Sequence, residues 1–510
     1  KPRGYDLRLH LPALMGEDIE EKNQRILSDY RETIGDMLRD FFTRQWSEWA
    51  GGHGAIIRNQ AHGSPANILD LYNIVDIPEI EGIEPLRIRM ASSAGNVSGK
   101  KLVSSESATW LDEHFESSLA DIKTALDRFM LNGVNHLFYH GTSYSPPDEP
   151  WPGWLFYAAV HLNPRNPQWN DFHVLNKYVE RCQSFLQNTL PDNDVLLYYP
   201  IYDVYAAPGP KRLQHFDGIG REFAGSSFEK TAEALNRGGY AFDYISDSQI
   251  RDFSVAGGEI VTEGNAQYKA LIIPSCTFMP LSTLEKIHAL IQAGVRVVFM
   301  NDLPGSFSGF SDYDHATKEF EKLKQSVRSE IVQGTNVQIL PDGFDDVALS
   351  RILSKETIIE QGLSFIRKKQ TDGTKVYLIN NPGGKKFEGW VVLQSNGKAI
   401  VAYDPMTGGF GKARSKNEAD HTEVYLQLDP GQSLILQFYN TAPGVEDYYY
   451  AKEESSIPVE GEWQLRFISG GPELPKPLKT RKLSYWSALG DSSYRNFSGT
   501  CSYLINFRKP

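Results

Sequence analysis

The N-terminal part of the chain is constrained most by a repeated alternation between helical and strand-forming patterns. Over residues 19–49, apolar side chains recur at three- and four-residue spacing, which predicts a long amphipathic helix. Helical segments then separate four short strand patterns, at residues 54–61, 76–81, 101–106 and 134–140. Repeated βα units place their strands side by side and parallel. These residues therefore predict a parallel α/β sheet, either open or closed into a barrel.

The rest of the chain divides into a second α/β unit and a β-rich region. Continuous apolar strand patterns, for example at residues 194–199 and 270–274, are typical of a doubly wound open sheet that is buried on both faces. From about residue 355 onward, period-two alternation predicts β-sandwich strands. A chain of 510 residues is too long for one core. We expect four parts: the C-terminal half of a (β/α)8 barrel at 1–193, an open flavodoxin-like α/β domain at 194–354, a β-sandwich at 355–455, and the start of a second, incomplete sandwich at 456–510.

Composition excludes several classes of protein. A net charge of −12 argues against a nucleic-acid partner, which calls for basic patches. No apolar run approaches the roughly 18 residues that span a bilayer, so we expect no membrane span. Cys182, Cys276 and Cys501 lie far apart, so neither a zinc site nor a disulfide framework is expected. Both ends of the chain read as mid-domain sequence, which suggests a fragment of a longer enzyme.

Three consecutive strand patterns of the first unit end in carboxylate or histidine residues that could take part in catalysis. Glu79 and Glu81 end the second pattern, Glu106 ends the third within a cluster of serines, and His140 ends the fourth. Active sites of β/α barrels lie at the carboxyl ends of the strands, so these residues predict a sugar-cleaving site. The alternatives are a solvated strand-end charge for Glu106, a plain surface or capping charge for one of the other two carboxylates, and a core histidine for His140.

Further polar and aromatic residues near these strand ends are candidates for substrate binding. Asn59 and His62 follow the first strand pattern, although the same residues also suit a turn. Trp110 follows Glu106, and Trp154 lies in a loop rich in Pro and Trp over residues 146–170. Long structureless loops are usually functional or disordered, and the aromatic content argues against disorder. The loop is expected to be a hydrophobic cap, a platform for sugar rings, or both.

Several segments together resemble glycoside hydrolase family 106, the alpha-L-rhamnosidases. The resemblance runs across nearly the whole chain and is carried by residues 3–7, 58–72, 76–81, 104–110, 138–146 and 403–408 in order. It implies an inverting, exo-acting hydrolase of terminal alpha-L-rhamnosyl linkages in plant-type glycans, in a calcium-dependent site. It also implies a barrel, an open α/β unit and appended β-sandwiches, and a periplasmic or secreted location.

The resemblance also suggests roles for the acidic residues. Inversion requires one carboxyl group as acid and another as base, roughly 6.5–9.5 Å apart. Glu106 is expected to be the base, while the acid is expected on a strand upstream of Lys1, with Glu79 as the fallback. Glu79 and Glu81 are the expected calcium ligands, with Asn59 as a further candidate, since calcium prefers oxygen ligands.

Two other functions remain open from the sequence. A retaining beta-galactosidase-like enzyme also joins a barrel to an open α/β unit, and its carboxyl groups would be about 5–5.5 Å apart. A non-catalytic carbohydrate-binding fragment would fit the incomplete ends and the β-sandwich patterns. In each case the expected partner is an oligosaccharide or glycoside.

Overall fold

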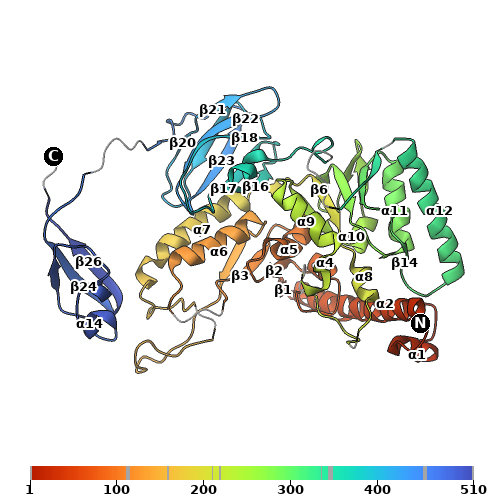
Figure 1. The fold of residues 1–510 in the computed structure, drawn as a ribbon, viewed down its shortest axis with the longest axis horizontal. Coiled ribbons are helices and arrows are strands. Elements are labelled where there is room, and N and C mark those ends of the chain that lie inside the picture. The colour runs from red at the N-terminus through yellow and green to blue at the C-terminus, as the bar shows by residue number, and fades with distance from the viewer. Residues whose placement is uncertain are drawn as a thin grey trace.

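The computed structural model describes most of the chain. The described ranges are residues 3–110, 115–157, 160–209, 211–216, 220–334, 336–342, 349–451 and 457–507. Two α/β units and a β-sandwich lie against one another, and a small sheet near the C-terminus is set to one side (Figure 1). No helix among the described residues is both long and apolar enough to cross a membrane.

The N-terminal helical region is divided where a single helix was predicted. It comprises α1 (Leu11–Met15), α2 (Glu20–Leu38) and α3 (Arg44–Gly52), and a π-helical turn at Arg39–Thr43 joins the last two. Buried Arg31 of α2 donates to the carbonyl oxygens that end α8 (Ile201–Ala206) of the second unit, at 2.8 Å from those of Tyr205 and Ala207. The N-terminal helices are therefore hydrogen-bonded to the second unit.

The first unit contains four short parallel strands in sequential order, as predicted. They are β1 (Arg58–Gln60), β2 (Ile77–Ile80), β3 (Ser104–Ser107) and β4 (His136–Tyr139). The accompanying helices are α4 (Ile68–Ile74), α5 (Pro85–Ser98), α6 (Leu119–Leu131) and α7 (Phe172–Leu186). The sequence pattern predicts a helix over residues 113–132, but α6 begins only at Leu119, because Ser118 and Asp121 form a capping box at its start. Residues 113 and 114 of that predicted helix lie outside the described part.

The second unit is a five-stranded parallel sheet. Its strands are β6 (Val195–Tyr198), β7 (Phe242–Ile245), β11 (Ala270–Ile273), β13 (Arg296–Met300) and β15 (Val337–Leu340). The spatial order β7-β6-β11-β13-β15 is the doubly wound order typical of flavodoxin-like sheets. The covering helices are α9 (Ser227–Arg237), α10 (Asp247–Arg251), α11 (Leu281–Gln292) and α12 (Tyr313–Val332). Three of its strands are buried at every position, which explains the continuous apolar sequences of β6 and β11.

Smaller strands accompany the second unit. They are β8 (Ser254–Ala256), β9 (Glu259–Val261) and β10 (Gln267–Tyr268) in one antiparallel sheet, and β12 (Phe278–Met279) with β14 (Ser306–Phe307) in a parallel pair. None of these short strands was predicted from the sequence. Runs of two or three residues show too little periodicity to identify.

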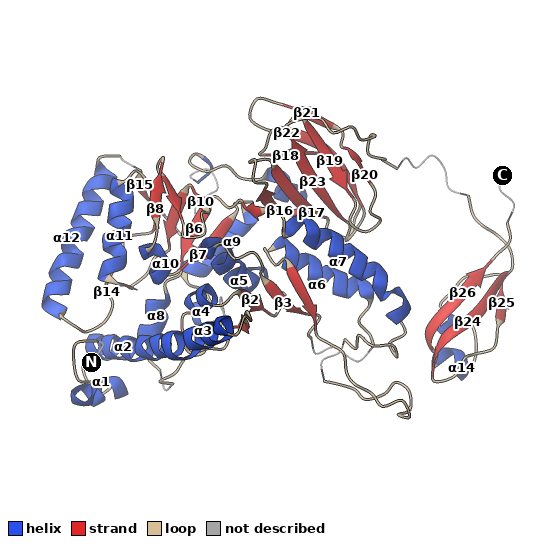
Figure 2. Ribbon diagram, turned by 180° about the vertical axis from the view of Figure 1, so that it is seen from behind, coloured by secondary structure: helices blue, strands red, loops and turns tan. Residues whose placement is uncertain are grey.

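The β-rich region forms two facing antiparallel sheets (Figure 2). The larger contains β5 (Leu190–Pro191), β16 (Ser364–Lys369), β17 (Lys375–Asn380), β19 (Ala399–Tyr403), β20 (Phe410–Lys412) and β23 (Ser433–Tyr439). The smaller contains β18 (Phe387–Leu393), β21 (Ser415–Asn417) and β22 (Thr422–Leu428). The separate sheet beyond residue 457 contains β24 (Trp463–Gly471), β25 (Leu478–Thr480) and β26 (Ser498–Leu504).

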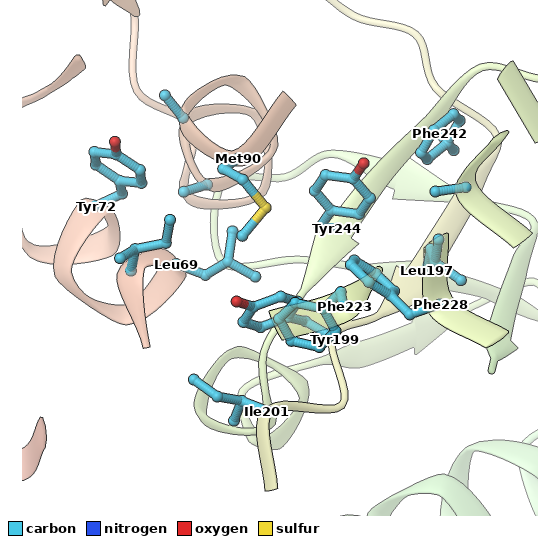
Figure 3. Packing of buried hydrophobic residues seen from close by; sticks show 14 of the residues in the cluster. Leu69, Tyr72, Met90, Leu197, Tyr199, Ile201, Phe223, Phe228, Phe242 and Tyr244 are labelled. Atoms are coloured by element: carbon cyan, nitrogen blue, oxygen red, sulfur yellow. The ribbon is translucent and has the colours of Figure 1, made fainter. Parts of the chain in front are cut away.

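One hydrophobic core joins the two α/β units, although the sequence suggests a boundary at residue 193. Leu69 and Tyr72 of α4 and Met90 of α5 lie in the same buried cluster as Leu197 and Phe228 of the second unit (Figure 3). Helix α5 is buried around much of its circumference, since it lies between the four-stranded sheet and β7. The orientation of the first sheet is therefore set by the second unit.

Candidate active site

Glu79 of β2 is a buried carboxylate that is fully engaged by its neighbours. Its side chain is 8% exposed, and Arg58 Nε lies 2.9 Å from Oε2. Ser104 Oγ donates to Oε2 at 2.7 Å, and Gln60 Nε2 donates to Oε1 at 3.2 Å. A buried charge is tolerated when it is paired and hydrogen-bonded in this way. The surroundings therefore hold both carboxyl oxygens of Glu79 in place.

Glu106 of β3 is more accessible and is held differently. Its side chain is 26% exposed, Gln60 Nε2 donates to Oε2 at 2.8 Å, and Thr109 Oγ1 donates to Oε1 at 2.9 Å. Burial acts to raise its pKa, but the hydrogen bonds from Gln60 and Thr109 and the nearby charges of His140 and His62 hold the pKa of Glu106 below its ordinary value. Glu106 is thus a half-buried carboxylate that is ionised at neutral pH.

Thr109 reaches Glu106 because the chain turns sharply after β3. Ala108 is buried and adopts φ of +68°, in the left-handed region that costs a non-glycine residue roughly 1–2 kcal/mol. The hydroxyl of Thr109 also lies 3.0 Å from His140 Nδ1. The Thr109 hydroxyl has one proton, which it donates to Glu106. Nδ1 of His140 is therefore the donor in its contact with Thr109. His140 Nδ1 itself lies 3.3 Å from Glu106 Oε1.

Gln60 links the two carboxylates and was not among the residues chosen from the sequence. One nitrogen, Nε2, contacts Glu79 Oε1 at 3.2 Å and Glu106 Oε2 at 2.8 Å, so these two oxygens are at most about 6 Å apart. Gln60 pairs with Glu79 in the sheet register. Alternation along β1 places Arg58 and Gln60 on one face of the strand and Asn59 on the other, but only the pairing of β1 with β2 brings Gln60 to Glu79.

Arg58 and the aromatic residues of β4 form one wall beside Glu79. The guanidinium of Arg58 lies over the ring of Phe138, 3.6 Å from its centroid, and Phe138 contacts His136 edge to face. Burial and the charge of Arg58 lower the pKa of His136. His136, Phe138 and Arg58 were not chosen from the sequence, because only the register of β1 to β4 brings them together.

The other residues predicted from the sequence are distributed around this centre. His62 Nε2 lies 3.3 Å from Glu81 Oε1, so these two residues form a separate pair next to the Glu79 cluster. Trp110 donates through Nε1 to Ser117 Oγ at 2.7 Å and packs against the cluster of α6 and α7. Trp154 is 54% exposed and contacts Tyr144 edge to face. No contact joins either tryptophan to Glu79 or Glu106 in the described part of the chain.

The predicted calcium ligands do not fit a cation in the present arrangement. Both oxygens of Glu79 accept hydrogen bonds, and Oε2 is paired with the cation of Arg58. Oε1 of Glu81 faces His62, with Arg87 Nη2 at 4.0 Å. No group of three or more His, Cys, Asp or Glu is placed to hold a metal ion within the ranges that the structure describes. We therefore derive no step through a metal from these residues.

Comparison with known proteins identifies the family. The model of the family described as alpha-L-rhamnosidase, glycoside hydrolase family 106, matches residues 1–415. The chain belongs to this family. A protein of Formosa agariphila, named provisionally as a beta-glucuronidase, is 26% identical over 473 residues, which cover 89% of this chain and 38% of that protein.

Solved structures of glycosidases share the mixed α/β fold of this family member. A rhamnosidase from Novosphingobium sp. PP1Y matches with a TM-score of 0.79 and 20% identity, over 99% of this chain and 49% of the other. A beta-galactosidase from Bacillus circulans sp. alkalophilus matches with a TM-score of 0.53 and 11% identity, over 81% and 68%. The chain thus spans about half the length of the rhamnosidase.

Proposed function

We propose that the chain carries the general base of an inverting, exo-acting alpha-L-rhamnosidase that hydrolyses terminal alpha-L-rhamnosyl linkages of plant-type glycans. Family membership supports the substrate class. The observation that carries the proposal is Glu106, an accessible carboxylate whose pKa is lowered, at the carboxyl end of a parallel strand. Carboxylates in this position serve as acids and bases in barrel enzymes.

In this mechanism Glu106 accepts the proton of a water molecule that attacks the anomeric carbon. Gln60 and Thr109 fix the two oxygens, so the lone pair that receives the proton has a defined direction. His140, donating to Thr109, keeps that hydroxyl pointed at Glu106. Thr109 and His140 thus position the base, and the accessible imidazole edge of His140 is available to a sugar hydroxyl.

Glu79 suits a positioning role better than that of the general acid. A general acid must face the leaving oxygen with its proton, whereas both oxygens of Glu79 accept hydrogen bonds from the protein and Oε2 contacts Arg58. Its Oε1 also lies within about 6 Å of Glu106 Oε2, closer than the roughly 6.5–9.5 Å of an inverting pair. We therefore place the acid on another strand of the barrel, of which β1 to β4 form the C-terminal half, in a periplasmic or secreted enzyme.

The test is Glu106→Gln in the intact protein, assayed with an aryl alpha-L-rhamnoside. The substitution keeps the shape and removes the basic charge, so kcat should fall roughly 10²–10⁴-fold. Glu48→Gln, at an exposed position of α3, is the matched control and should leave turnover unchanged. Near-normal turnover by Glu106→Gln would exclude the assignment.

The spacing of Glu79 and Glu106 supports a second candidate, a retaining glycosidase. Oxygens no more than about 6 Å apart are compatible with the roughly 5–5.5 Å separation of a retaining pair, and the fold is shared with a beta-galactosidase. Proton NMR of the first-formed anomer separates the two mechanisms. Parallel assays with aryl beta-galactoside and beta-glucuronide test the sugar, and sugar binding without any turnover would favour the carbohydrate-binding fragment.

A further inference from the structure

A cavity with several charged residues in its wall lies where the three large parts of the molecule meet, away from Glu106. It has a volume of about 270 Å³ and is lined by residues of α5, α6, β7 and β16, elements that meet near the middle of the molecule (Figure 2). Asn96 and Asn132, at the C-terminal ends of α5 and α6, are in its wall. In βα units these helix ends lie beside the amino ends of the following strands, opposite the end that carries the two carboxylates.

Lys368 of β16 supplies an unpaired cation to this cavity. Its side chain lines the cavity and is only 7% exposed. Across the described ranges, its ammonium group makes no hydrogen bond or ion pair, whereas lysines this deeply buried are normally paired. Burial lowers the pKa of Lys368 to about 8. The charges of Asp243, which lines the cavity, and of Asp192 attract this ammonium, but among the described residues neither carboxylate forms an ion pair with it.

Arg89 of α5 supplies a second cation that is only partly satisfied. Its Nη1 donates to the carbonyl of Phe242 at 3.2 Å, and its Nη2 donates to Asn236 Oδ1 at 3.4 Å, so both of these acceptors are neutral. Its Nε is buried and has no acceptor among the described residues. Burial lowers the pKa of Arg89. A buried donor without an acceptor is costly, so a ligand atom that accepts from Nε would be favoured.

The carboxylate of Asp243 attracts both cations but, among the described contacts, makes no ion pair with either. Asp243 accepts from Asn96 at 3.1 Å and from Asn193 and Tyr268 at 2.7 Å each, and burial raises its pKa. Asp127 is paired with Lys123 at 2.7 Å. Because Arg128 and Arg367 also line the cavity, its wall still carries more positive than negative side chains, in a site of low exposure where electrostatic attraction is strong.

We propose that this cavity is a binding site for a small oxyanion of the phosphate, sulfate or sugar-carboxylate class. Lys368 would provide a point charge, and Arg89 would donate from Nε to an anionic oxygen. Because the walls come from three separately organised parts of the chain, a bound anion would hold their junction together. The ligand would then stabilise the folded protein by mass action.

The test uses inorganic phosphate and the intact protein at constant ionic strength, with chloride as the reference anion. Calorimetry should show one phosphate bound per chain, and the unfolding temperature should rise with phosphate concentration. Lys368→Met should weaken binding at least tenfold, while Lys368→Arg should retain most of it. Lys369→Met is the matched control, since the next residue of β16 faces the other side of the strand and lies outside the cavity wall.

Two outcomes would overturn the proposal. One is the absence of phosphate, sulfate and glucuronate binding at millimolar concentrations, and the other is unchanged binding by Lys368→Met. If that variant does not fold, Arg89→Gln provides the same test, because it removes the second cation and the Nε donor. Titrations with sulfate and glucuronate separate an inorganic ligand from a sugar carboxylate.

Discussion

Gln60 is the residue on which the relative position of the two carboxylates depends. Replacing it with Leu keeps a similar volume and removes the hydrogen bonds to Glu79 and Glu106. The hydrogen bond from Gln60 helps to lower the pKa of Glu106, so the pKa should rise in Gln60→Leu. A base acts only when ionised, and the acidic limb of the pH profile should therefore move to higher pH.

The measurement is kcat/KM for an aryl alpha-L-rhamnoside across pH. On the acidic side of the profile we expect kcat/KM to fall roughly tenfold, which corresponds to the free energy of one hydrogen bond to a charged group. Gln45→Leu, at an exposed position of α3, serves as the control. An unchanged acidic limb in Gln60→Leu would show that the amide of Gln60 does not lower the pKa of Glu106.

The sequence indicates which strand ends are polar but does not reveal how their side chains pair. Glu106 and His140 were predicted as site residues, and the structure places them 3.3 Å apart. Arg58 and Gln60 were missed because their importance depends on the register of β1 against β2. Register is set by which faces become buried in the folded sheet and is not visible in one strand alone.

Helix α5 illustrates, at the scale of elements, how the two α/β units depend on each other. Its end at Gly99 approaches the loop before β10 so closely that a Cβ on Gly264 would lie 2.1 Å from the backbone nitrogen of Gly99. Gly264 N also donates to the carbonyl of Val97 at 3.1 Å. A side chain at Gly264 would therefore push this loop away from α5.

We expect Gly264→Ala to lower the free energy of unfolding by about 1–3 kcal/mol, as overpacking commonly does. Gly51→Ala provides the opposite control, because Gly51 lies in α3 with open space around it and alanine favours a helix by roughly 0.5–1 kcal/mol. Urea unfolding followed by circular dichroism measures both. Equal stability of Gly264→Ala and the unmodified protein would contradict a tight contact.

At the scale of the whole molecule, one buried arginine connects the β-sandwich to the second α/β unit. Arg367 of β16 lies 2.6 Å from Asp192 and 3.0 Å from Glu356, and it also pairs with Asp194. Glu356 is fully buried. Arg367→Met would leave these carboxylates without their central cation, at a cost of about 3–5 kcal/mol.

Thermal or urea unfolding measures this loss directly. Lys416→Met, which breaks an exposed pair with Glu423 on the same sandwich, should cost no more than about 1 kcal/mol. A similar small effect of both substitutions would show that the buried network contributes little to the junction.

Metal dependence is the remaining prediction for the whole molecule, and it comes from the family resemblance. Exhaustive treatment with EDTA should abolish rhamnosidase activity of the intact protein, and calcium should restore it because calcium prefers oxygen ligands, while zinc should not. Glu79 is engaged by Arg58, so rearrangement or oxygens from elsewhere would be required. Full activity after chelation would count against a metal in the reaction.

The sequence by itself determined the order of the α/β units, the alternating strands of the sandwich and the strand ends at which Glu79, Glu106 and His140 lie. These features follow from local periodicity and from residues next to one another in the chain. Only the tertiary structure decided that α5 joins two sheets in one core, that Gln60 lies between two carboxylates, and that Lys368 faces a cavity shared by three parts. Each of these depends on segments that are distant in sequence and are brought together by burial of their apolar faces.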